Sequence, residues 1–206
     1  MCAVSKTRNK ALWIALLVLL IASAVSAVFP PQKKEKPLDD APLLDQTGRD
    51  VRLKDFKDKV VLVNFIFTSC PHQGCNLMSL QFLRVQLMHK DKLGKELFLL
   101  SISIDPEKDT PETLKKFAEK YKADPSGWFF LTGPSETIET LRKSYGVEWT
   151  TGKDGKKRHT TIIALLDRKG DKAAVYNDSN YDTNKIVADI KNLLDGRPLQ
   201  NIPVQQ

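Results

Sequence analysis

The stretch VVLVNFIFTSCPHQGC, residues 60–75, joins an apolar run to two cysteines and guides the interpretation of the whole chain. Its β-branched and apolar residues at 60–67 are typical of a strand buried on both faces of a sheet. Cys70 and Cys75 follow directly and lie in one short loop. They could form a small disulfide, cycle between thiol and disulfide, or hold a metal.

The residues after this loop alternate between helical and strand patterns. Apolar residues recur at helical spacing in LMSLQFLRVQLMHKDKLG, and Gly94 is expected to end that helix. Residues 97–104 predict a second buried strand. DTPETLKKFAEKY predicts a helix with Thr110 as its N-cap and Pro111 in its first turn.

The C-terminal half continues this alternation. We expect a short strand in GWFFLTG, a helix in PSETIETLRKSYG, a strand at about 159–166, a last strand, and a closing helix in DTNKIVADIKNLLDG. Ahead of residue 60, two alternating segments around Gly48 predict a hairpin. The chain is therefore predicted to be α/β with a thioredoxin-like fold, in which helices flank a central mixed sheet behind an N-terminal membrane segment.

The N-terminus has the features of an anchor or a signal peptide. Lys6, Arg8 and Lys10 precede an uncharged apolar run at 11–29, and a bilayer span takes about 20 residues. The small residues VSA at 25–27 also fit a cleavage site. Both alternatives export the rest of the chain. We expect an inner (cytoplasmic) membrane protein with a single anchor and its domain in the periplasm, or a periplasmic or secreted protein if the run is cleaved.

Composition shifts divide the chain into five parts. They are a basic cytoplasmic flank at 1–10, the anchor or signal peptide at 11–29, a Pro-rich linker at 30–41, the thioredoxin-like domain at 42–195 and a flexible tail at 196–206.

The charge balance argues against one class of partner. The formal net charge is +7, and removing the three charges of the flank leaves +4 for the exported part. This mildly basic domain shows no basic-aromatic pattern, so nucleic acid is not expected as a partner.

The position of the two cysteines favours reactive sulfur. A helix N-terminus stabilises thiolate, which both disulfide exchange and metal binding require. A chain of 206 residues can build a core without disulfides, so a purely structural disulfide is the least favoured use. Cys2 precedes the apolar run and would remain on the cytoplasmic side.

A metal site needs a further ligand, and the chain has three histidines. His89 lies in a lysine-flanked segment and is expected at the surface. His72 lies inside the cysteine loop, where it could ligate a metal, tune a thiol or simply be exposed. His159 opens the strand HTTIIALLD, which should run close to the cysteine loop in a thioredoxin-like sheet. It is a candidate ligand, although a polar residue at a strand edge also fits the pattern.

Four segments, in the right order, resemble the Sco/SenC family: VVLVNFIFTSCP, SISIDPEKDTPETLKKFAEKY, WFFLTG and HTTIIALLDRKG. The resemblance covers roughly residues 42–194. Members of this family are thioredoxin-fold copper chaperones that help assemble the dinuclear copper site of cytochrome c oxidase. The resemblance implies copper, as Cu(I) or Cu(II), as the bound metal. It implies the copper-centre subunit of the oxidase as the partner, with other periplasmic copper chaperones or thiol reductases as further partners.

The same resemblance implies Cys70, Cys75 and His159 as copper ligands, and it places Asp105 near the site or in a turn-capping role. Two thiolates and one imidazole suit soft Cu(I) and can also hold Cu(II) or zinc. The chain departs from the family in the loop itself. Four residues separate the cysteines where the family has three, and Asn76 replaces a proline. Copper binding is therefore the property to test.

Other functions compete with a metallochaperone. In a thiol–disulfide oxidoreductase, Cys70 would attack and Cys75 would resolve, with no need for a metal. A peroxide-reducing or redox-sensing relative is less favoured, because no peroxiredoxin-type Thr-x-x-Cys is present. A binding module with a structural disulfide is the remaining alternative. Whether the protein is an enzyme therefore stays open at this point.

Overall fold

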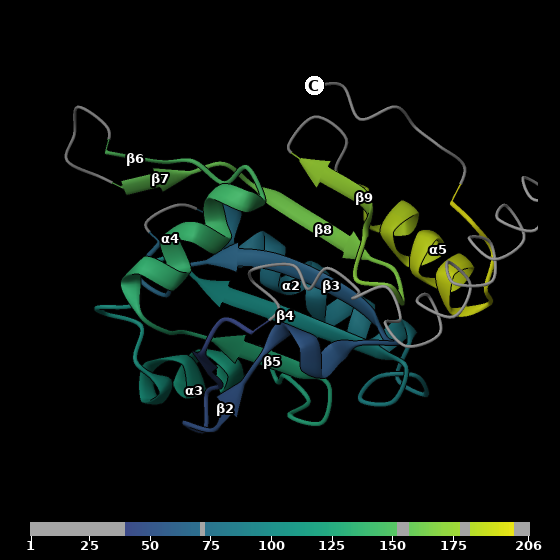
Figure 1. Ribbon diagram of the computed structural model, residues 1–206, viewed down its shortest axis with the longest axis horizontal. Coiled ribbons are helices and arrows are strands. Elements are labelled where there is room, and N and C mark those ends of the chain that lie inside the picture. Colours follow the sequence, from purple (N-terminus) through teal and green to yellow (C-terminus); the bar gives the residue numbers. More distant parts are fainter. Residues whose placement is uncertain (1–39, 71–72, 152–156, 178–181, 200–206) are drawn as a thin grey trace, which may run out of the picture. The chain divides into compact units, whose positions relative to one another are not determined.

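Five strands form the central sheet of the protein, in the order β5-β4-β3-β8-β9 (Figure 1). They are β3 (Val60–Ile66), β4 (Leu97–Ser103), β5 (Trp128–Leu131), β8 (Ile162–Leu166) and β9 (Lys172–Asn177). The pairs β3–β4 and β4–β5 are parallel, whereas β8 runs antiparallel to both β3 and β9. The predicted mixed sheet is thus confirmed, and the strand that leads to the cysteines lies at its centre.

The computed structural model describes part of the chain, namely residues 40–70, 73–151, 157–177 and 182–199, with side chains omitted at 73–75, 151, 157 and 158. The predicted anchor or signal peptide at 11–29 and most of the predicted linker lie outside this part. None of the helices within it is long and apolar enough to cross a membrane.

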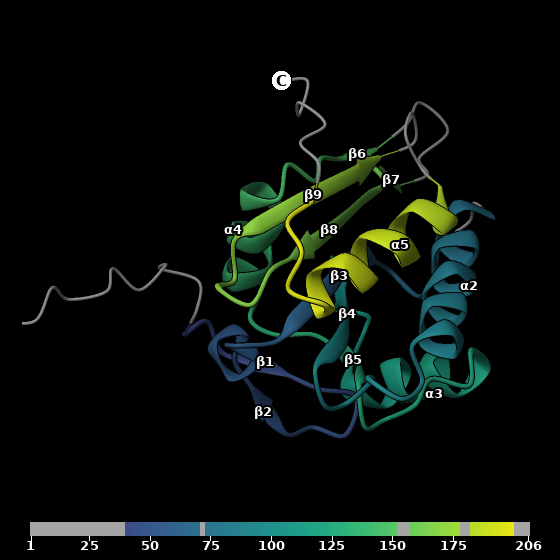
Figure 2. The same ribbon diagram turned by 90° about the vertical axis from the view of Figure 1, so that its right-hand side faces the viewer.

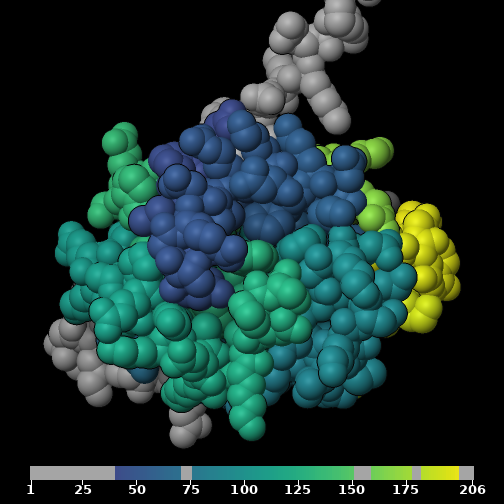
Figure 3. Space-filling view, turned by 90° about the horizontal axis from the view of Figure 1, so that it is seen from below, coloured from purple at the N-terminus to yellow at the C-terminus, as the bar shows by residue number. Residues whose placement is uncertain are grey.

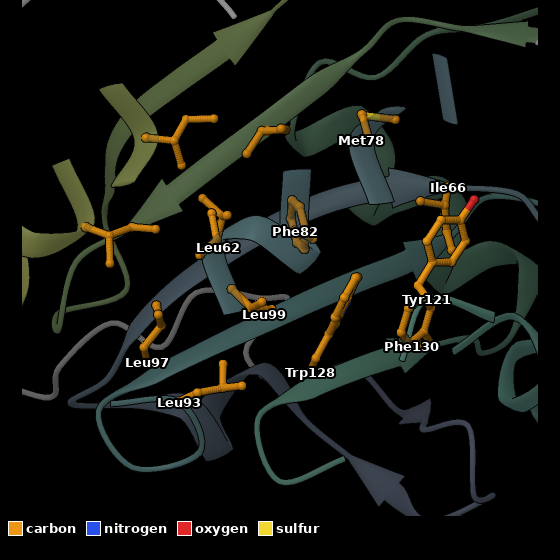
Figure 4. Packing of buried hydrophobic residues seen from close by; sticks show 14 of the residues in the cluster. Leu62, Ile66, Met78, Phe82, Leu93, Leu97, Leu99, Tyr121, Trp128 and Phe130 are labelled. Atoms are coloured by element: carbon orange, nitrogen blue, oxygen red, sulfur yellow. The ribbon is translucent and has the colours of Figure 1, made fainter. Parts of the chain in front are cut away.

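Every residue of β3 is buried, and its side chains alternate between two cores. Leu62 and Ile66 belong to a core that includes Phe82 of α2 (Gln73–Met88), Phe117 of α3 (Pro111–Lys120) and Ile190 of α5 (Thr183–Leu194). Figure 4 shows part of this core, with the side chains of β3, β4 and β5 facing α2. Three helices therefore cover this face of the sheet.

The odd-numbered residues of β3 enter the second core on the opposite face. Val63 and Phe65 pack there with Leu141 of α4 (Ser135–Ser144) and with Leu43 of β1 (Leu43–Leu44). Figure 2 shows α2 and α4 on opposite sides of the sheet. Among the described residues, the buried core residues lie between Ala41 and Ile190, within the compact unit 37–206. This unit carries complete cores and is expected to fold without the preceding segment.

The predicted hairpin around Gly48 is confirmed. Strand β1 pairs antiparallel with β2 (Asp50–Val51), Gly48 has a positive φ of 81°, and the 3-10 helix η1 (Leu53–Phe56) follows. The hairpin joins the rest of the fold through Leu44, whose N–H donates to the Thr132 carbonyl at 2.8 Å. In Figure 3 this purple and blue segment lies over teal and green segments from later in the chain.

Helix boundaries agree with the sequence in one case and differ in another. Helix α3 begins at Pro111, and the Thr110 hydroxyl accepts a bond from the Thr113 N–H at 3.3 Å, as an N-cap does. Helix α2 ends at Met88, six residues before the predicted stop at Gly94. The intervening residues form turns that begin at His89.

Candidate metal centre

Cys70 lies just beyond the carboxyl end of β3. Phe67 continues the strand direction and is 2% exposed, whereas Cys70 is half-buried. Between them the chain turns back, and the Cys70 N–H donates to the Phe67 carbonyl at 3.2 Å. The buried strand β3 therefore leads to Cys70 at the edge of the core, where the Cys70 side chain is partly exposed to solvent.

A buried carboxylate holds the chain segment that leads to Cys70. Asp109 is fully buried and accepts a hydrogen bond from the Thr68 hydroxyl at 2.5 Å and one from the Thr68 N–H at 3.1 Å. It also accepts from the Ser103 hydroxyl at the end of β4, at 2.6 Å. These hydrogen bonds, which we call the Asp109 clamp, tie the residues before Cys70 to the neighbouring strand. Asp109 was not among the predicted site residues, although the Asp-Thr pair just before the following helix is a signal that points to it.

Asp105 has a different role from Asp109. Its backbone carbonyl accepts from the N–H groups of Lys108 and Asp109, and its carboxylate lies 3.8 Å from the Lys108 ammonium. These contacts build the turn between β4 and α3, which was one of the two predicted roles. The link from this turn to the cysteine segment runs through Asp109.

Cys75 lies in the first turn of α2, as its third residue, so the predicted helix N-terminus is confirmed. Its side chain, and all of His72, lie outside the described residues. The next residue, Asn76, accepts a hydrogen bond from the Tyr121 hydroxyl at the end of α3, at 2.5 Å. The residue that departs from the family pattern thus gives α2 a side-chain contact that a proline could not make.

His159 does not open the central strand as predicted. It ends β7 (Lys157–His159), which pairs antiparallel with β6 (Trp149–Thr151) in a separate two-stranded sheet. Strand β8 begins only at Ile162, after two threonines. The hairpin is held at its base by Thr160, whose N–H donates to the Glu148 carbonyl at 3.0 Å. The hairpin is visible at the upper left of Figure 1, and His159 pairs with Trp149 within it.

One aromatic residue brings the hairpin and the cysteine segment together. The Phe67 ring lies 5.6 Å from the His159 ring and 5.1 Å from the Trp149 ring, centroid to centroid, and both contacts are edge-on. Trp149 is the cross-strand partner of His159. Phe67 therefore contacts His159 through its ring, and its backbone carbonyl accepts a bond from the Cys70 N–H, so both residues lie close to Phe67.

The orientation of His159 suits a metal ligand. Its Nδ1 lies 2.9 Å from the Thr160 carbonyl oxygen. A carbonyl can only accept, so Nδ1 carries the proton and Nε2 carries the lone pair. Backbone carbonyls commonly orient metal-binding histidines in this way. A half-buried cysteine and an imidazole, both next to Phe67, are ligand types that fit a soft metal ion.

His89 is not at the surface, contrary to the prediction. It is 7% exposed, and its Nε2 lies 3.2 Å from the Val187 carbonyl of α5. Burial lowers the pKa of His89 from its ordinary value. The neighbouring lysines were misleading because the chain turns at His89 and points the ring under α5.

The described side chains contain no group of three or more His, Cys, Asp or Glu residues placed to hold a metal. The predicted set of Cys70, Cys75 and His159 is not covered by that search, because the Cys75 side chain lies outside it. The structure does bring the other two members to the same end of the sheet.

Comparison with known proteins identifies the family. The family model described as SCO1/SenC matches residues 32–195. The chain belongs to the SCO1/SenC family. Its sequence is 34% identical over 152 residues to a SCO1 protein homolog of Bacillus subtilis, covering 71% of this chain and 77% of the relative. It spans less than two thirds of the length of some other curated relatives.

Solved structures show the same fold. ScoI of Bradyrhizobium japonicum, solved with copper bound, is 31% identical, with a TM-score of 0.61 over 74% of this chain and 96% of that one. BsSco, described as a Sco-family cytochrome c oxidase assembly protein with a disulfide switch, is 30% identical, with a TM-score of 0.62 over 79% of this chain and 98% of that one. The predicted family and thioredoxin-like fold are thus confirmed.

Proposed function

We propose that this SCO1/SenC protein binds copper through Cys70, Cys75 and His159 and acts as a metallochaperone. The observation that carries the proposal is the position of Phe67, whose ring lies 5.6 Å from the His159 ring and whose backbone carbonyl accepts a bond from the Cys70 N–H at 3.2 Å. Phe67 thus links a histidine and a cysteine almost 90 residues apart, which supports their assignment to one metal ion. Copper-bound relatives support the choice of metal.

The chemistry of the residues determines how copper would be held. Thiolates of Cys70 and Cys75 would supply two soft ligands, and Nε2 of His159 would supply the third. Each thiol must first lose its proton, so loading should release protons and weaken at low pH. The position of Cys75 in the first turn of α2 favours its thiolate, because unpaired N–H groups there are partly positive. The edge position of Cys70 leaves room for an acceptor to approach.

The proposed destination is the dinuclear copper site of cytochrome c oxidase, to which the protein would deliver copper or reducing equivalents. A relative described as an oxidase assembly protein supports this assignment. The uncharged run at 11–29 would place the domain outside the cytoplasm, in the compartment where such a site is assembled.

A thiol–disulfide oxidoreductase that uses the same cysteines is the second candidate. The disulfide switch in BsSco favours it. In this mechanism the Cys70 thiolate attacks a partner disulfide, Cys75 resolves the mixed disulfide, and the partner leaves as a dithiol. His159 has no part in those steps, so this residue discriminates between the two candidates.

An anaerobic copper titration of reduced residues 31–206 tests the proposal, with Cys75→Ser and His159→Ala as variants. One copper bound tightly per chain and weakened by both substitutions is expected for a chaperone. His159→Ala should still form the Cys70–Cys75 disulfide at the wild-type potential. Weak copper binding that does not depend on His159 would contradict the proposal and favour the oxidoreductase.

A further inference from the structure

The exposed large apolar side chains of the described residues all lie on one helix, α2. Leu77 is 48% exposed, Leu80 53%, Leu87 64% and Met88 60%. The other face of α2 already packs into the core through Met78, Phe82 and Val85. An ordinary surface helix presents polar residues to solvent on its outer side. The apolar outer face of α2 therefore needs another explanation.

These four residues form an apolar stripe that Arg84 interrupts near its middle. At 100° per residue, positions 77, 80, 87 and 88 fall within about 100° of one another around the helix. They extend about 16 Å along the axis, from the first turns to the last residue of α2. We call this set the α2 stripe. Exposed apolar side chains gathered on one face in this way are typical of an interaction surface.

The α2 stripe is continuous with the proposed metal centre. Leu77 comes two residues after Cys75 on the same helix, and Cys70 immediately precedes the loop that leads into it. An acceptor must bring its own ligands within bonding distance of these sulfurs for a metal ion to pass between them. A protein docked along α2 would hold those ligands at the N-terminal end of the helix.

The stripe faces away from the place where the N-terminal segment joins the domain. Asp40 lies against η1, where its carbonyl accepts from Arg52 at 2.7 Å and its carboxylate pairs with Lys54. That region belongs to the core of β1 and α4, on the other face of the sheet from α2. The first described residues therefore lie on the other side of the sheet from the stripe.

Charge indicates what kind of protein would fit. Arg84 lies within the stripe, between Leu80 and Leu87, and Lys90 is exposed just beyond the helix. The Arg84 guanidinium donates to Asn184 of α5 at 2.7 Å, which holds it beside the apolar side chains. An apolar patch with carboxylates around it would complement this surface.

We propose that the α2 stripe is the docking surface for the protein that exchanges copper with Cys70 and Cys75. The geometry fits a partner that carries its metal ligands at one end of an apolar patch and acidic residues farther along. The identity of that partner rests on the proposed function, but docking can be measured without copper. Leu87 and Met88 lie about 18 Å along the helix from Cys75, so changes there test docking separately from metal binding.

The test measures the affinity between residues 31–206 and the soluble domain of the copper-centre oxidase subunit from the same genome, by calorimetry with both proteins metal-free. The variant is Leu87→Gln with Met88→Gln, because glutamine keeps helix propensity. The matched control is Glu136→Gln with Thr140→Gln, on α4 at the opposite face. We expect the stripe variant to bind at least tenfold more weakly and to transfer copper correspondingly more slowly. The control should bind as wild type, and all proteins should have the same copper affinity.

Several outcomes would overturn the proposal. One is that the stripe variant binds the partner as tightly as wild type, or that wild type does not bind it at all. Another is that wild type forms a dimer that the variant loses, with partner affinity unchanged, since a second copy would then occupy the stripe. Stripe-dependent binding to vesicles containing phosphatidylglycerol, again with partner affinity unchanged, would assign it to lipid. If wild type fails to bind copper but docks through the stripe, the proposed function fails and the docking surface stands.

Discussion

Two histidines in this protein each contact a backbone carbonyl through one ring nitrogen, but they differ in which nitrogen makes the contact and in how deeply the ring is buried. His89 and His159 each place one ring nitrogen on a backbone carbonyl, at 3.2 Å from Val187 and 2.9 Å from Thr160. His89 uses Nε2, is buried, and joins α2 to α5. His159 uses Nδ1, which directs its Nε2 lone pair elsewhere. These two differences, in the nitrogen that makes the contact and in the burial of the ring, support our proposal that His159 is a metal ligand and His89 a structural residue.

The largest predicted difference between the two histidines concerns copper. Removing one of three ligands should cost about 4 kcal/mol of binding, or roughly a thousandfold in affinity. We therefore expect His159→Ala to lower copper affinity by about that factor, measured by competition with a chelator of known affinity. His89→Ala should bind copper as wild type does. Equal losses in both variants would show that they act through general destabilisation.

A second prediction concerns the contribution of the Asp109 clamp to the stability of the protein. Asp109→Ala leaves the Thr68 N–H and the hydroxyls of Thr68 and Ser103 without their acceptor. Each buried donor left unsatisfied costs about 1 kcal/mol or more. Urea unfolding should show a loss of about 3 kcal/mol.

Glu107→Ala is the matched control for Asp109, since it removes an exposed carboxylate from the same turn. It should change stability by less than about 0.5 kcal/mol. If Asp109→Ala were equally mild, the clamp on the Cys70 segment would not exist as described.

The third prediction concerns stability and pH at His89. His89→Ala should lower the free energy of unfolding by about 2 kcal/mol at pH 7.5, because it removes a buried ring and its bond to Val187. His159→Ala should cost less than about 1 kcal/mol. Calorimetric or urea unfolding of both variants gives the comparison.

The pH dependence follows from the lowered pKa of His89, which is caused first by burial. Unfolded chains bind the proton more readily, so this contribution is complete above the unfolded pKa of about 6.5 and is lost as pH falls toward the folded pKa. The stability gap between wild type and His89→Ala should therefore narrow between pH 7.5 and pH 5. A gap that widens on acidification would contradict the assignment of a neutral, buried ring.

The smallest predicted effect tests how the hairpin supports His159. Trp149→Leu removes the ring that packs on Phe67 and faces His159 across the hairpin. Aromatic pairs contribute about 1 kcal/mol beyond burial. We expect copper affinity to fall about fivefold, against no change for Thr150→Ala on the same strand. No change in Trp149→Leu would mean that the strand pairing alone positions His159.

The sequence predicted the parts of the fold that local patterns determine. The run before Cys70 became the central strand, and the Thr110 and Pro111 signals marked the start of α3. His89 was wrongly predicted to be exposed because its neighbours in the sequence are charged. In the structure the chain turns at His89, and the ring is buried against α5.

The candidate site was only partly predictable for a similar reason. His159 was found through its family motif but assigned to the wrong strand, because two threonines extend a β pattern that the chain breaks at that point. The clamp by Asp109 and the contact of Phe67 with His159 join segments more than 40 residues apart. No local pattern contains that information.

The central claim is that Cys70, Cys75 and His159 bind one copper ion together. X-ray absorption of reduced residues 31–206 loaded with one Cu(I) tests it most directly, alongside His159→Ala and His89→Ala. The account predicts two sulfur ligands and one imidazole in wild type and in His89→Ala, with the imidazole lost only in His159→Ala. A wild-type site made of sulfur alone, or an imidazole that persists in His159→Ala, would contradict it.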